Sequence, residues 1–272
     1  MRDFHGTIAI TGAGSGFGEA LAHRYAGAGY RVAVTDIDGE RAEKVHAAVS
    51  SAGGRGFAQQ LDVTSGPDWD ALYQQIMTEW GGLEILVNNA GVAAAGRLED
   101  TPIEDWKWVL EIDLMGVVRG CHRFLPIMRE QRHGKVVNFA SFAGMVPVPE
   151  VSAYATAKSG VVALSEQLRV DLDRSGVNVT LVCPAYVQTR LLETFRSQDE
   201  RHRETAERWM SRSGVTAEKV ADQVYKAVEK DEFLVLTHRE TRWLWRMKRW
   251  FPERFYRTMV KIARKLKGRT AA

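Results

Sequence analysis

Short apolar segments alternate with longer mixed segments along most of this chain. The short runs are rich in Val and Ile, and their length is typical of buried strands. We expect such strands over residues 7–11, 31–35, 56–61, 84–87, 135–139, 177–182 and 233–236. Helical patterns separate them, over residues 41–49, 69–79, 104–130 and 153–174, with a further helix around residues 19–22. Apolar strands separated by helices predict a doubly wound parallel α/β sheet of about seven strands with helices on both faces.

The chain divides into two parts of different character. Residues 1–236 contain no repeat, low-complexity stretch or Pro/Gly/Ser linker, so we expect one domain there, long enough to bury a full core. Residues 237–272 contain 12 Lys and Arg but only 2 acidic residues, a local charge of +10. Because the whole chain carries +3, the remaining residues carry −7. The sequence predicts a mildly acidic domain followed by a basic tail.

Composition narrows the class of protein further. The hydrophobic fraction of 45% and the charged fraction of 26% are typical of globular proteins and exclude disordered and collagen-like chains. Cys121 and Cys183 cannot form a disulfide framework, so we expect buried free thiols and a reducing compartment. No apolar run reaches the roughly 18–20 residues of a membrane span, and the first residues do not resemble a signal peptide. The seven histidines lack metal-site spacing. We expect a cytoplasmic protein without a metal site.

A glycine-rich segment follows the first expected strand. Residues 11–18 satisfy the spacing T-G-x-x-x-G-x-G, with Gly12, Gly16 and Gly18 at the glycine positions. The segment lacks the Gly-Lys-Ser/Thr ending of a P-loop and does not fit the strict G-x-G-x-x-G spacing. Glycines there allow a tight turn and close approach of a pyrophosphate to a helix N-terminus. The segment favours a Rossmann-type dinucleotide site, although it could also shape only a tight turn.

Asp36 lies at the end of the second expected strand. A carboxylate there can accept hydrogen bonds from both ribose hydroxyls of an adenosine and would repel a 2′-phosphate. Asp38 adds negative charge, and Ile37 supplies no cation. The alternative role is a turn or helix cap. Together with the glycine segment, Asp36 predicts NAD as the cofactor rather than NADP.

Tyr154 and Lys158 lie four residues apart, on one face of an expected helix. A free phenol has a pKa near 10, and a neighbouring ammonium stabilises the phenolate, so such a pair gives an acid–base group for neutral pH. Ser141 precedes Tyr154 by 13 residues, after another expected strand. The spacing Y-x-x-x-K is common in ordinary helices, so its meaning depends on the surrounding motifs.

These motifs occur in one order along the chain. The glycine segment is followed by Asp36, Asp62-Val63, Asn88-Asn89-Ala90-Gly91, Ser141, the Tyr154/Lys158 pair and the segment from Pro184 to Thr189. In this order, over about residues 5–236, the chain resembles the tyrosine-dependent short-chain dehydrogenase/reductase family.

The resemblance implies a role for each motif. It implies that Tyr154 is the acid–base residue, that Lys158 lowers its pKa and binds the nicotinamide ribose, and that Ser141 holds the substrate oxygen. The implied cofactor-binding residues are Gly12, Ser15, Gly16, Phe17, Gly18, Asp36, Asp62, Val63, Asn89, Ala90, Gly91, Tyr154, Lys158, Pro184, Val187 and Thr189. Ser141 and Thr189 could alternatively serve as structural caps.

One position departs from the family pattern. The family usually has a fourth catalytic residue, an Asn, within the long middle helix, and here Asp113 occupies that position. An Asp accepts the same backbone hydrogen bonds but cannot donate an amide N–H, and it would place a negative charge near Lys158. The sequence leaves open whether Asp113 maintains or weakens this part of the site.

These features predict an oxidoreductase that transfers a hydride between NAD(H) and an alcohol or carbonyl group. About residues 190–213 correspond to the family's substrate lid, where Leu191, Leu192, Phe195, Trp209 and Met210 could line a pocket or pack on the body. We expect a hydrophobic small-molecule substrate, such as a steroid, a terpenoid or a long-chain compound. The alternatives are a catalytically silent NAD-binding interaction protein and a fatty acyl-CoA or aldehyde reductase. The family resemblance also implies a homodimer or homotetramer.

The basic tail has two interpretations of equal weight. Trp243, Met247 and Trp250 recur at helical spacing, Pro252 is expected to separate two helices, and Phe255, Met259, Ile262 and Leu266 form a second stripe. Lys and Arg residues, Lys265 among them, fill the other faces. Such helices either lie on an anionic membrane surface or pack on the protein. No recognition motif accompanies the charge, so we do not expect nucleic-acid binding.

Overall fold

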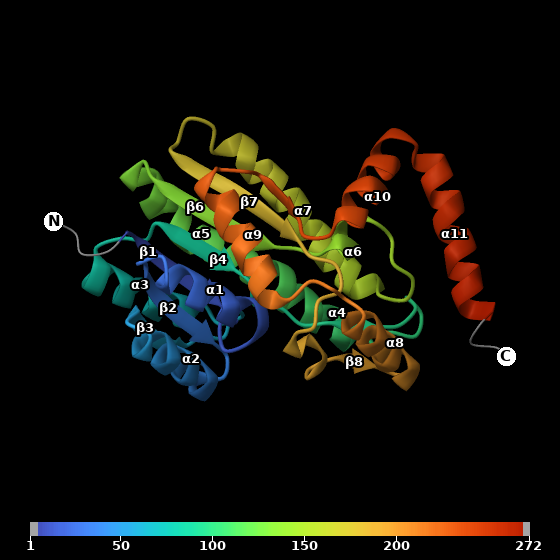
Figure 1. Ribbon diagram of the computed structural model, residues 1–272, viewed down its shortest axis with the longest axis horizontal. Helices are drawn as coiled ribbons and strands as arrows, with labels where there is room; N and C mark the ends of the chain where they lie inside the picture. Colours follow the sequence, from blue (N-terminus) through green and yellow to red (C-terminus); the bar gives the residue numbers. More distant parts are fainter. Residues whose placement is uncertain (1–4, 269–272) are drawn as a thin grey trace.

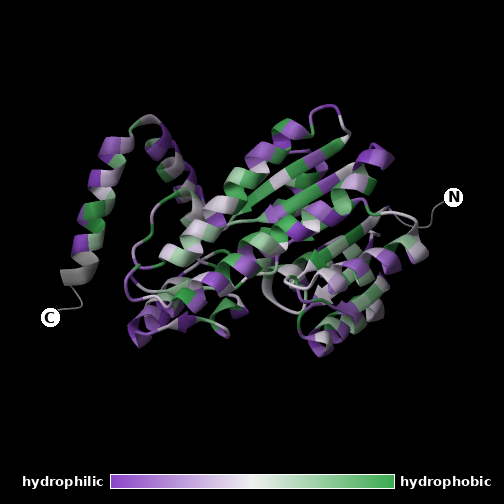
Figure 2. Cartoon of the chain, turned by 180° about the vertical axis from the view of Figure 1, so that it is seen from behind, coloured by the Kyte–Doolittle hydropathy of each residue, from purple (hydrophilic) through white to green (hydrophobic). Residues whose placement is uncertain are grey.

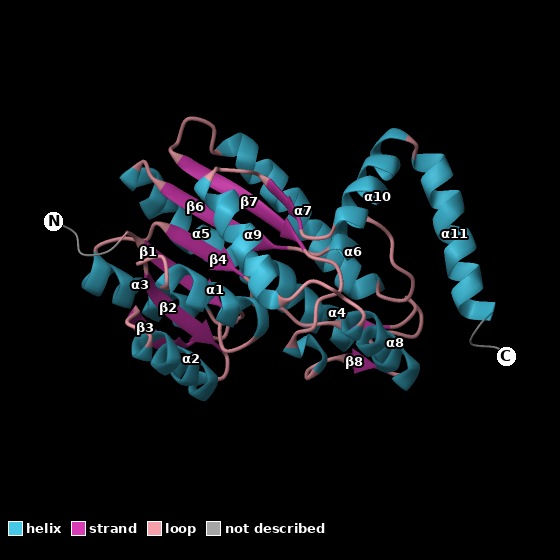
Figure 3. Ribbon diagram, viewed as in Figure 1, coloured by secondary structure: helices cyan, strands magenta, loops and turns pink. Residues whose placement is uncertain are grey.

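A computed structural model describes residues 5–268 of the chain, with side chains through Arg264. The expected tail residues Lys265 and Leu266 therefore lie outside the described side chains. Seven strands form a parallel sheet in the order β3-β2-β1-β4-β6-β7-β9, with helices on both sides (Figures 1 and 3). The strands are β1 (Thr7–Thr11), β2 (Arg31–Asp36), β3 (Arg55–Gln60), β4 (Ile85–Asn88), β6 (Gly134–Phe139), β7 (Val177–Cys183) and β9 (Leu234–Leu236). The expected doubly wound α/β fold is confirmed.

Alternating side chains of the strands face two separate cores. Ile8 and Ile10 of β1 pack against the face covered by α1, α2 and α9, whereas Ala9 between them packs against the face covered by α3, α5 and α7. The bounds of these helices are α1 (Gly16–Ala26), α2 (Gly39–Ser51), α3 (Gly66–Trp80), α5 (Gly116–Gln131), α7 (Ser152–Asp171) and α9 (Ala217–Glu229). Hydrophobic residues accordingly concentrate in the strands of the sheet (Figure 2). Cys121 and Cys183 are free and buried, as expected.

The long helix expected over residues 104–130 is interrupted. The structure has α4 (Ile103–Leu110), then one π-helical turn (Glu111–Met115), and then α5. A π-turn inserts an extra residue into the helix and re-aims the side chains around it, and such turns are frequent at functional sites. Asp113 lies in this turn. Hydrophobic periodicity does not reveal an insertion of one residue, which is why the sequence predicted a continuous helix.

The expected lid segment is only partly helical. It contains a 3₁₀ turn (Arg190–Leu192), the short strand β8 (Arg196–Ser197) and the helix α8 (Glu200–Ser211). Strand β8 pairs in parallel with β5 (Ala94–Ala95), outside the main sheet. Outside the lid, the short helix α6 (Phe142–Met145) follows β6. The small β5–β8 sheet ties the lid to the body.

The tail forms a helical hairpin that projects from one end of the body (Figure 1). Its helices are α10 (Arg239–Trp250) and α11 (Pro252–Gly268), so Pro252 begins the second helix. Of the expected stripe on α10, Met247 packs on the core, whereas Trp243 and Trp250 are 63% and 74% exposed. The residues of α10 that pack on the core are Leu244, Trp245 and Met247. Trp245, two residues after Trp243, lies on the opposite side of the helix, whereas Met247, four residues after it, lies close to the Trp243 side and borders the core.

Candidate active site

The glycine segment forms a close-packed turn between β1 and α1. Gly12 and Gly16 adopt φ angles of +64° and +57°, in the left-handed region that favours glycine. A Cβ atom on Gly18 would lie 2.3 Å from the carbonyl oxygen of Gly12. The backbone of this turn can therefore adopt its conformation only with glycine at these positions. It leaves room for a ligand to approach the N-terminus of α1, where backbone N–H groups favour an anion.

Hydrogen bonds between the end of β1 and the segment that follows β4 hold this turn in place. The Thr11 hydroxyl accepts hydrogen bonds from the backbone N–H groups of Asn89 and Ala90, both at 3.0 Å. The Asn89 side chain donates to the carbonyl oxygens of Thr11 at 2.9 Å and Gly12 at 3.1 Å. The ends of two neighbouring parallel strands are thereby joined at the edge of the sheet where ligands bind in doubly wound folds.

Asp36 and a nearby arginine lie at one end of the turn. The two carboxylate oxygens of Asp36 accept hydrogen bonds from the backbone N–H groups of Gly14 at 2.9 Å and Asp38 at 3.0 Å. Arg41, on α2, pairs with Asp38 at 3.1 Å and with Glu193 of the lid at 2.9 Å. Arg41 is a cation near Asp36 that was not predicted, because only the neighbouring residues Ile37 and Asp38 were compared for charge. The position of Arg41 in the first turn of α2, five residues after Asp36, was the available signal.

One cavity of about 1320 Å³ connects the glycine turn with the expected catalytic residues. Single small-molecule sites measure about 300–1,000 Å³, so this cavity has room for a dinucleotide and a second molecule. The predicted site residues that line it are Gly12, Ser15, Gly16, Phe17, Asp36, Asp62, Val63, Asn89, Ala90, Gly91, Asp113, Ser141, Tyr154, Lys158, Pro184, Val187 and Thr189. Gly18 does not line the cavity, because it is packed beneath the turn. The predicted residues thus lie around one space, although they come from distant parts of the sequence.

A buried polar chain positions the helix that carries Tyr154 and Lys158. The Asn88 amide donates to the Asn138 side-chain oxygen at 2.8 Å, and the Asn138 amide donates to the Ser165 hydroxyl at 3.0 Å. These residues lie on β4, β6 and α7, and Asn138 and Ser165 are fully buried. Buried polar groups that are satisfied in this way fix the relative placement of the elements that carry them. This chain of hydrogen bonds joins residues far apart in the sequence and was not predicted.

Ser141, Tyr154 and Lys158 meet at the carboxyl end of β6. Ser141 lies two residues after the end of β6 and caps α6, its hydroxyl accepting a hydrogen bond from the Ala143 N–H at 3.2 Å. The Lys158 ammonium lies 5.9 Å from the centre of the Tyr154 ring and donates to the Phe139 carbonyl oxygen at 3.2 Å. Thr189 likewise caps the following 3₁₀ turn. The capping roles considered from the sequence are therefore present, and the same side chains also face the cavity.

Asp113 forms a buried ion pair with Lys158. One Asp113 oxygen lies 3.2 Å from the Lys158 Nζ atom, and the other accepts a hydrogen bond from the Val92 N–H at 2.7 Å. The two side chains are 0% and 5% exposed. The carboxylate thus accepts the backbone hydrogen bond that an Asn side-chain oxygen could also accept. In addition, it places a negative charge beside the lysine.

Burial and these charges shift the pKa values of Tyr154, Lys158 and Asp113. Burial raises the pKa of the Tyr154 phenol, Lys158 opposes that rise, Asp113 adds to it, and a hydrogen bond with Ser141 opposes it. Burial alone would lower the pKa of Lys158, but Asp113 and Tyr154 outweigh it and raise this pKa. Burial raises the pKa of Asp113, against the effects of Lys158 and the Val92 N–H. Lys158 is therefore held as a cation beside the phenol.

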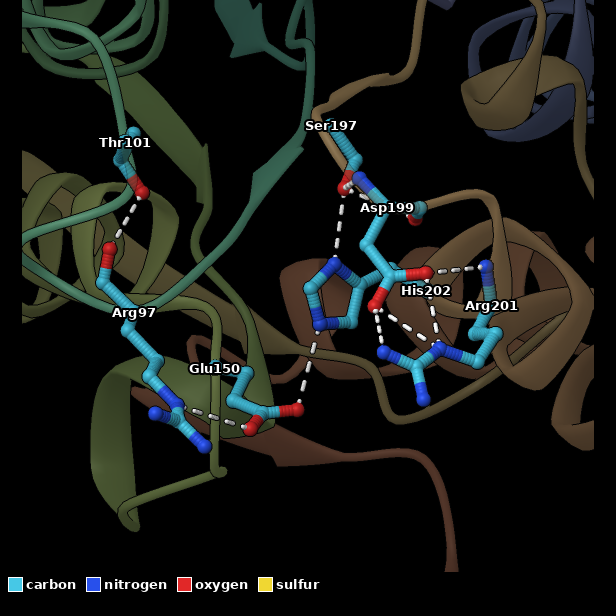
Figure 4. Close-up of polar contacts among 7 residues, drawn as sticks. All are labelled: Arg97, Thr101, Glu150, Ser197, Asp199, Arg201 and His202. Atoms are coloured by element: carbon cyan, nitrogen blue, oxygen red, sulfur yellow. Dashed lines mark hydrogen bonds and ion pairs between the residues drawn. The ribbon is translucent and has the colours of Figure 1, made fainter. Parts of the chain in front are cut away.

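A polar network joins the lid to the body at the other end of the cavity (Figure 4). His202 of α8 contacts Glu150 through Nε2 at 3.2 Å and Ser197 through Nδ1 at 2.7 Å. The Arg97 Nε atom lies 3.6 Å from the other Glu150 oxygen. Glu150 has a φ angle of +62°, a conformation uncommon for a residue with a side chain. Arg97, Glu150 and His202 line the cavity. No sequence motif indicated them, because their contacts join segments that are far apart along the chain.

The remaining lid residues give the cavity an apolar wall. Leu191, Leu192, Phe195, Trp209 and Met210 line it, and the Trp209 ring lies 4.7 Å from the ring of Tyr186, centre to centre. Within residues 5–268 no cluster of three or more metal-ligating side chains is present. None of the helices in that part of the chain is long and apolar enough to cross a bilayer.

The arrangement fits a dinucleotide at one end of the cavity and an acid–base group beside it. The glycine turn would receive the pyrophosphate, and Asp36 and Asn89 lie at its edges. This fit rests on the crowding at Gly12 and Gly18, where any side chain would collide with the backbone.

Comparison with known proteins agrees with this arrangement. The family model described as short chain dehydrogenase matches residues 6–200. The chain is 31% identical over 259 residues to the "CLA biosynthesis dehydrogenase/reductase" of Lactiplantibacillus plantarum, covering 88% of this chain and 91% of that protein. It is 32% identical to "3beta-hydroxysteroid dehydrogenase 1" of Eggerthella lenta, over 72% of this chain and 76% of that protein.

A solved structure resembles most of this chain. It is a short-chain dehydrogenase/reductase of Burkholderia phymatum in complex with NAD, 32% identical in sequence, with a TM-score of 0.84. The match covers 92% of this chain and 95% of the other. With the glycine turn, the Tyr154–Lys158 helix and the parallel sheet, these matches place the chain in the short-chain dehydrogenase/reductase family of oxidoreductases.

Proposed function

We propose that this chain is an NAD(H)-dependent dehydrogenase/reductase that interconverts a hydrophobic secondary alcohol and its ketone, or an alcohol and its aldehyde. One observation carries the proposal: Ser141, Tyr154 and Lys158 face the same cavity as the glycine turn and Asp36. A protein that only bound a dinucleotide would not need a buried phenol paired with a buried ammonium.

Tyr154, Lys158 and Ser141 each have a separate role in the reaction. The bound nicotinamide would accept or donate the hydride. In the oxidation direction the Tyr154 phenolate takes the proton of the substrate hydroxyl, and in the reduction direction the phenol returns it to the carbonyl oxygen. Lys158 stabilises the phenolate by its charge. Ser141 donates a hydrogen bond to the substrate oxygen and keeps that oxygen close to Tyr154.

The charges around the adenosine end favour NAD over NADP. Asp36 would face the ribose hydroxyls and repel a 2′-phosphate. Arg41 is the nearby cation, and its guanidinium is already paired with Asp38 and Glu193. The similar structure from Burkholderia phymatum is a complex with NAD, which supports the same cofactor here.

The lid favours a hydrophobic substrate. Five apolar lid side chains line the cavity between α8 and the catalytic residues. Relatives of this chain include enzymes named for hydroxysteroid and cyclohexanol oxidation, whose substrates are apolar rings that carry a secondary hydroxyl. The polar network around Glu150 and His202 would meet a second polar group of such a substrate.

A substrate panel tests the proposal. Purified protein is given NAD or NADP with cyclic, steroidal and long-chain secondary alcohols, and NADH or NADPH with the matching ketones and aldehydes. We expect turnover with NAD(H) and at least one apolar secondary alcohol, and molecular-mass measurement by light scattering should show a homodimer or homotetramer. Binding of NADH without turnover on any member would instead favour the catalytically silent interaction protein.

A further inference from the structure

The hairpin of α10 and α11 is anchored to the body along one side only. Leu244, Trp245 and Met247 of α10 pack against the core, and Phe255 at the start of α11 is completely buried. The Lys248 ammonium donates a hydrogen bond to the Met145 carbonyl oxygen on α6. Beyond this anchor, α11 runs back beside one end of the body and ends near α8 (Figure 1). The hairpin is thus a fixed part of the fold with most of its surface uncovered.

The uncovered face of α10 combines tryptophan with arginine. Trp243 and Trp250 are seven residues apart, so they lie on the same side of the helix, and both are largely exposed. Arg242, Arg246 and Arg249 flank them on that side and are also exposed. Tryptophan with flanking arginine is typical of helices that lie in the interface between water and lipid.

Helix α11 separates apolar and cationic residues onto different faces. Tyr256, Val260 and Ile262 are 43–48% exposed, and Phe251 in the turn before the helix is 58% exposed. Arg254, Arg257, Lys261 and Arg264 follow one another at intervals of three or four residues, which places them in a row. Among the described residues, no acidic side chain forms an ion pair with any of these four.

We propose that the α10–α11 hairpin docks this protein on an anionic membrane surface. Neighbouring cations on one helix face repel each other, and a broad anionic surface removes this cost for the whole row at once. The exposed aromatic and aliphatic side chains next to them would enter the headgroup region, which adds a contribution that salt does not screen. A second copy of this chain, whose residues 1–236 carry a net charge of −7, is the competing partner, and the membrane is favoured because its headgroup region also receives the exposed apolar side chains.

The same hairpin borders the cavity. Ala263 of α11 lines it together with Arg208, Trp209 and Arg212 of α8. Docking would bring this part of the cavity wall close to the lipid surface and shorten the path of an apolar substrate from the membrane to the site. That consequence rests on the proposed function, whereas docking itself does not.

Co-sedimentation with vesicles tests the docking. The full-length protein is mixed with vesicles of phosphatidylcholine alone or with phosphatidylserine, at low and at high salt. We expect binding to the phosphatidylserine vesicles at low salt, weaker but measurable binding at high salt, and little binding to phosphatidylcholine alone. Protein that stays in the supernatant with phosphatidylserine at low salt overturns the proposal.

Matched variants attribute the binding to the hairpin. Arg257→Glu/Lys261→Glu should lower the affinity for phosphatidylserine vesicles by about tenfold or more, whereas Lys44→Glu/Arg55→Glu, on the exposed surface of the body, should change it much less. Trp243→Ala/Trp250→Ala should remove the binding that persists at high salt. Equal losses in the hairpin and body variants would refute a specific docking face.

A second readout identifies the competing partner and separates failure of docking from failure of the proposed function. Light scattering without lipid should give the same molecular mass for the wild type and the Arg257→Glu/Lys261→Glu variant. A dimer that this variant dissociates, with no vesicle binding by the wild type, would assign the hairpin to a second copy of the chain. Turnover of a water-soluble alcohol should be equal in both proteins, because none of the changed residues faces the catalytic group.

Discussion

Asp113 is the residue at which this chain departs most clearly from its family. Its carboxylate is buried, pairs with Lys158 and raises the pKa of Tyr154 by opposing a second negative charge. An Asn at this position would still accept the hydrogen bond from the Val92 N–H but would carry no charge. Asp113 can thus keep the backbone hydrogen bond of an Asn at this position, but it adds a negative charge beside Lys158.

Asp113→Asn should therefore shift the pH dependence of catalysis. Without the carboxylate, the phenolate form of Tyr154 is less disfavoured, so its pKa falls and the base is available at lower pH. We expect the acidic limb of the profile of kcat/KM for alcohol oxidation to move to lower pH. A move to higher pH, or none, would mean that Asp113 acts mainly by holding Lys158 in place.

Asp36 should decide the choice between NAD and NADP. Removing its carboxylate in Asp36→Ala takes away the repulsion of a 2′-phosphate, and Arg41 is close enough to the site to attract one. We expect the ratio of kcat/KM for NAD to that for NADP to fall by about tenfold or more. Glu43→Ala, an exposed residue of α2, should leave the ratio unchanged. A wild-type preference for NADPH would remove Asp36 from the ribose site.

At the scale of elements, the lid depends on contacts with the body. Strand β8 pairs with β5, and His202 of α8 reaches Glu150 before α7 and Ser197 in β8. His202→Ala removes both side-chain contacts, each worth about 0.5–1.5 kcal/mol. We expect KM for the alcohol to rise by about tenfold, with a smaller change in kcat and none in KM for NAD. His133→Ala, on an exposed turn before β6, is the control, and equal effects of the two changes would contradict this role of the lid contact.

At the scale of the whole molecule, the tail helices stabilise the fold as well as forming part of its exposed surface. Phe255 fills a site in the core from a position beyond the last strand. Phe255→Ala should lower the free energy of unfolding by about 3–5 kcal/mol, measured by urea denaturation, because it leaves a cavity. Tyr256→Ala, which is 44% exposed, should cost much less. Similar small losses in both variants would show that the hairpin is attached only loosely.

The sequence predicted the sheet well because buried parallel strands are short, apolar and separated by helices. It also predicted one shared site for Gly12, Asp36, Ser141 and Tyr154, because motifs at the carboxyl ends of parallel strands meet at one edge of the sheet. It could not reveal the π-turn at Asp113, since one inserted residue leaves the hydrophobic pattern nearly intact. Contacts such as His202 with Glu150 join distant segments and leave no local signal.

The most direct test of the account is the substitution Tyr154→Phe, which removes the hydroxyl that carries the proton and leaves the ring in place. Turnover of the best alcohol of the panel and binding of NADH, by fluorescence titration, are measured on the same preparation. We predict that turnover falls by about 10²–10⁴-fold while the Kd for NADH changes by less than about threefold. Retention of more than about a tenth of wild-type turnover, with the cofactor still bound, would contradict the assignment of Tyr154 as the acid–base residue.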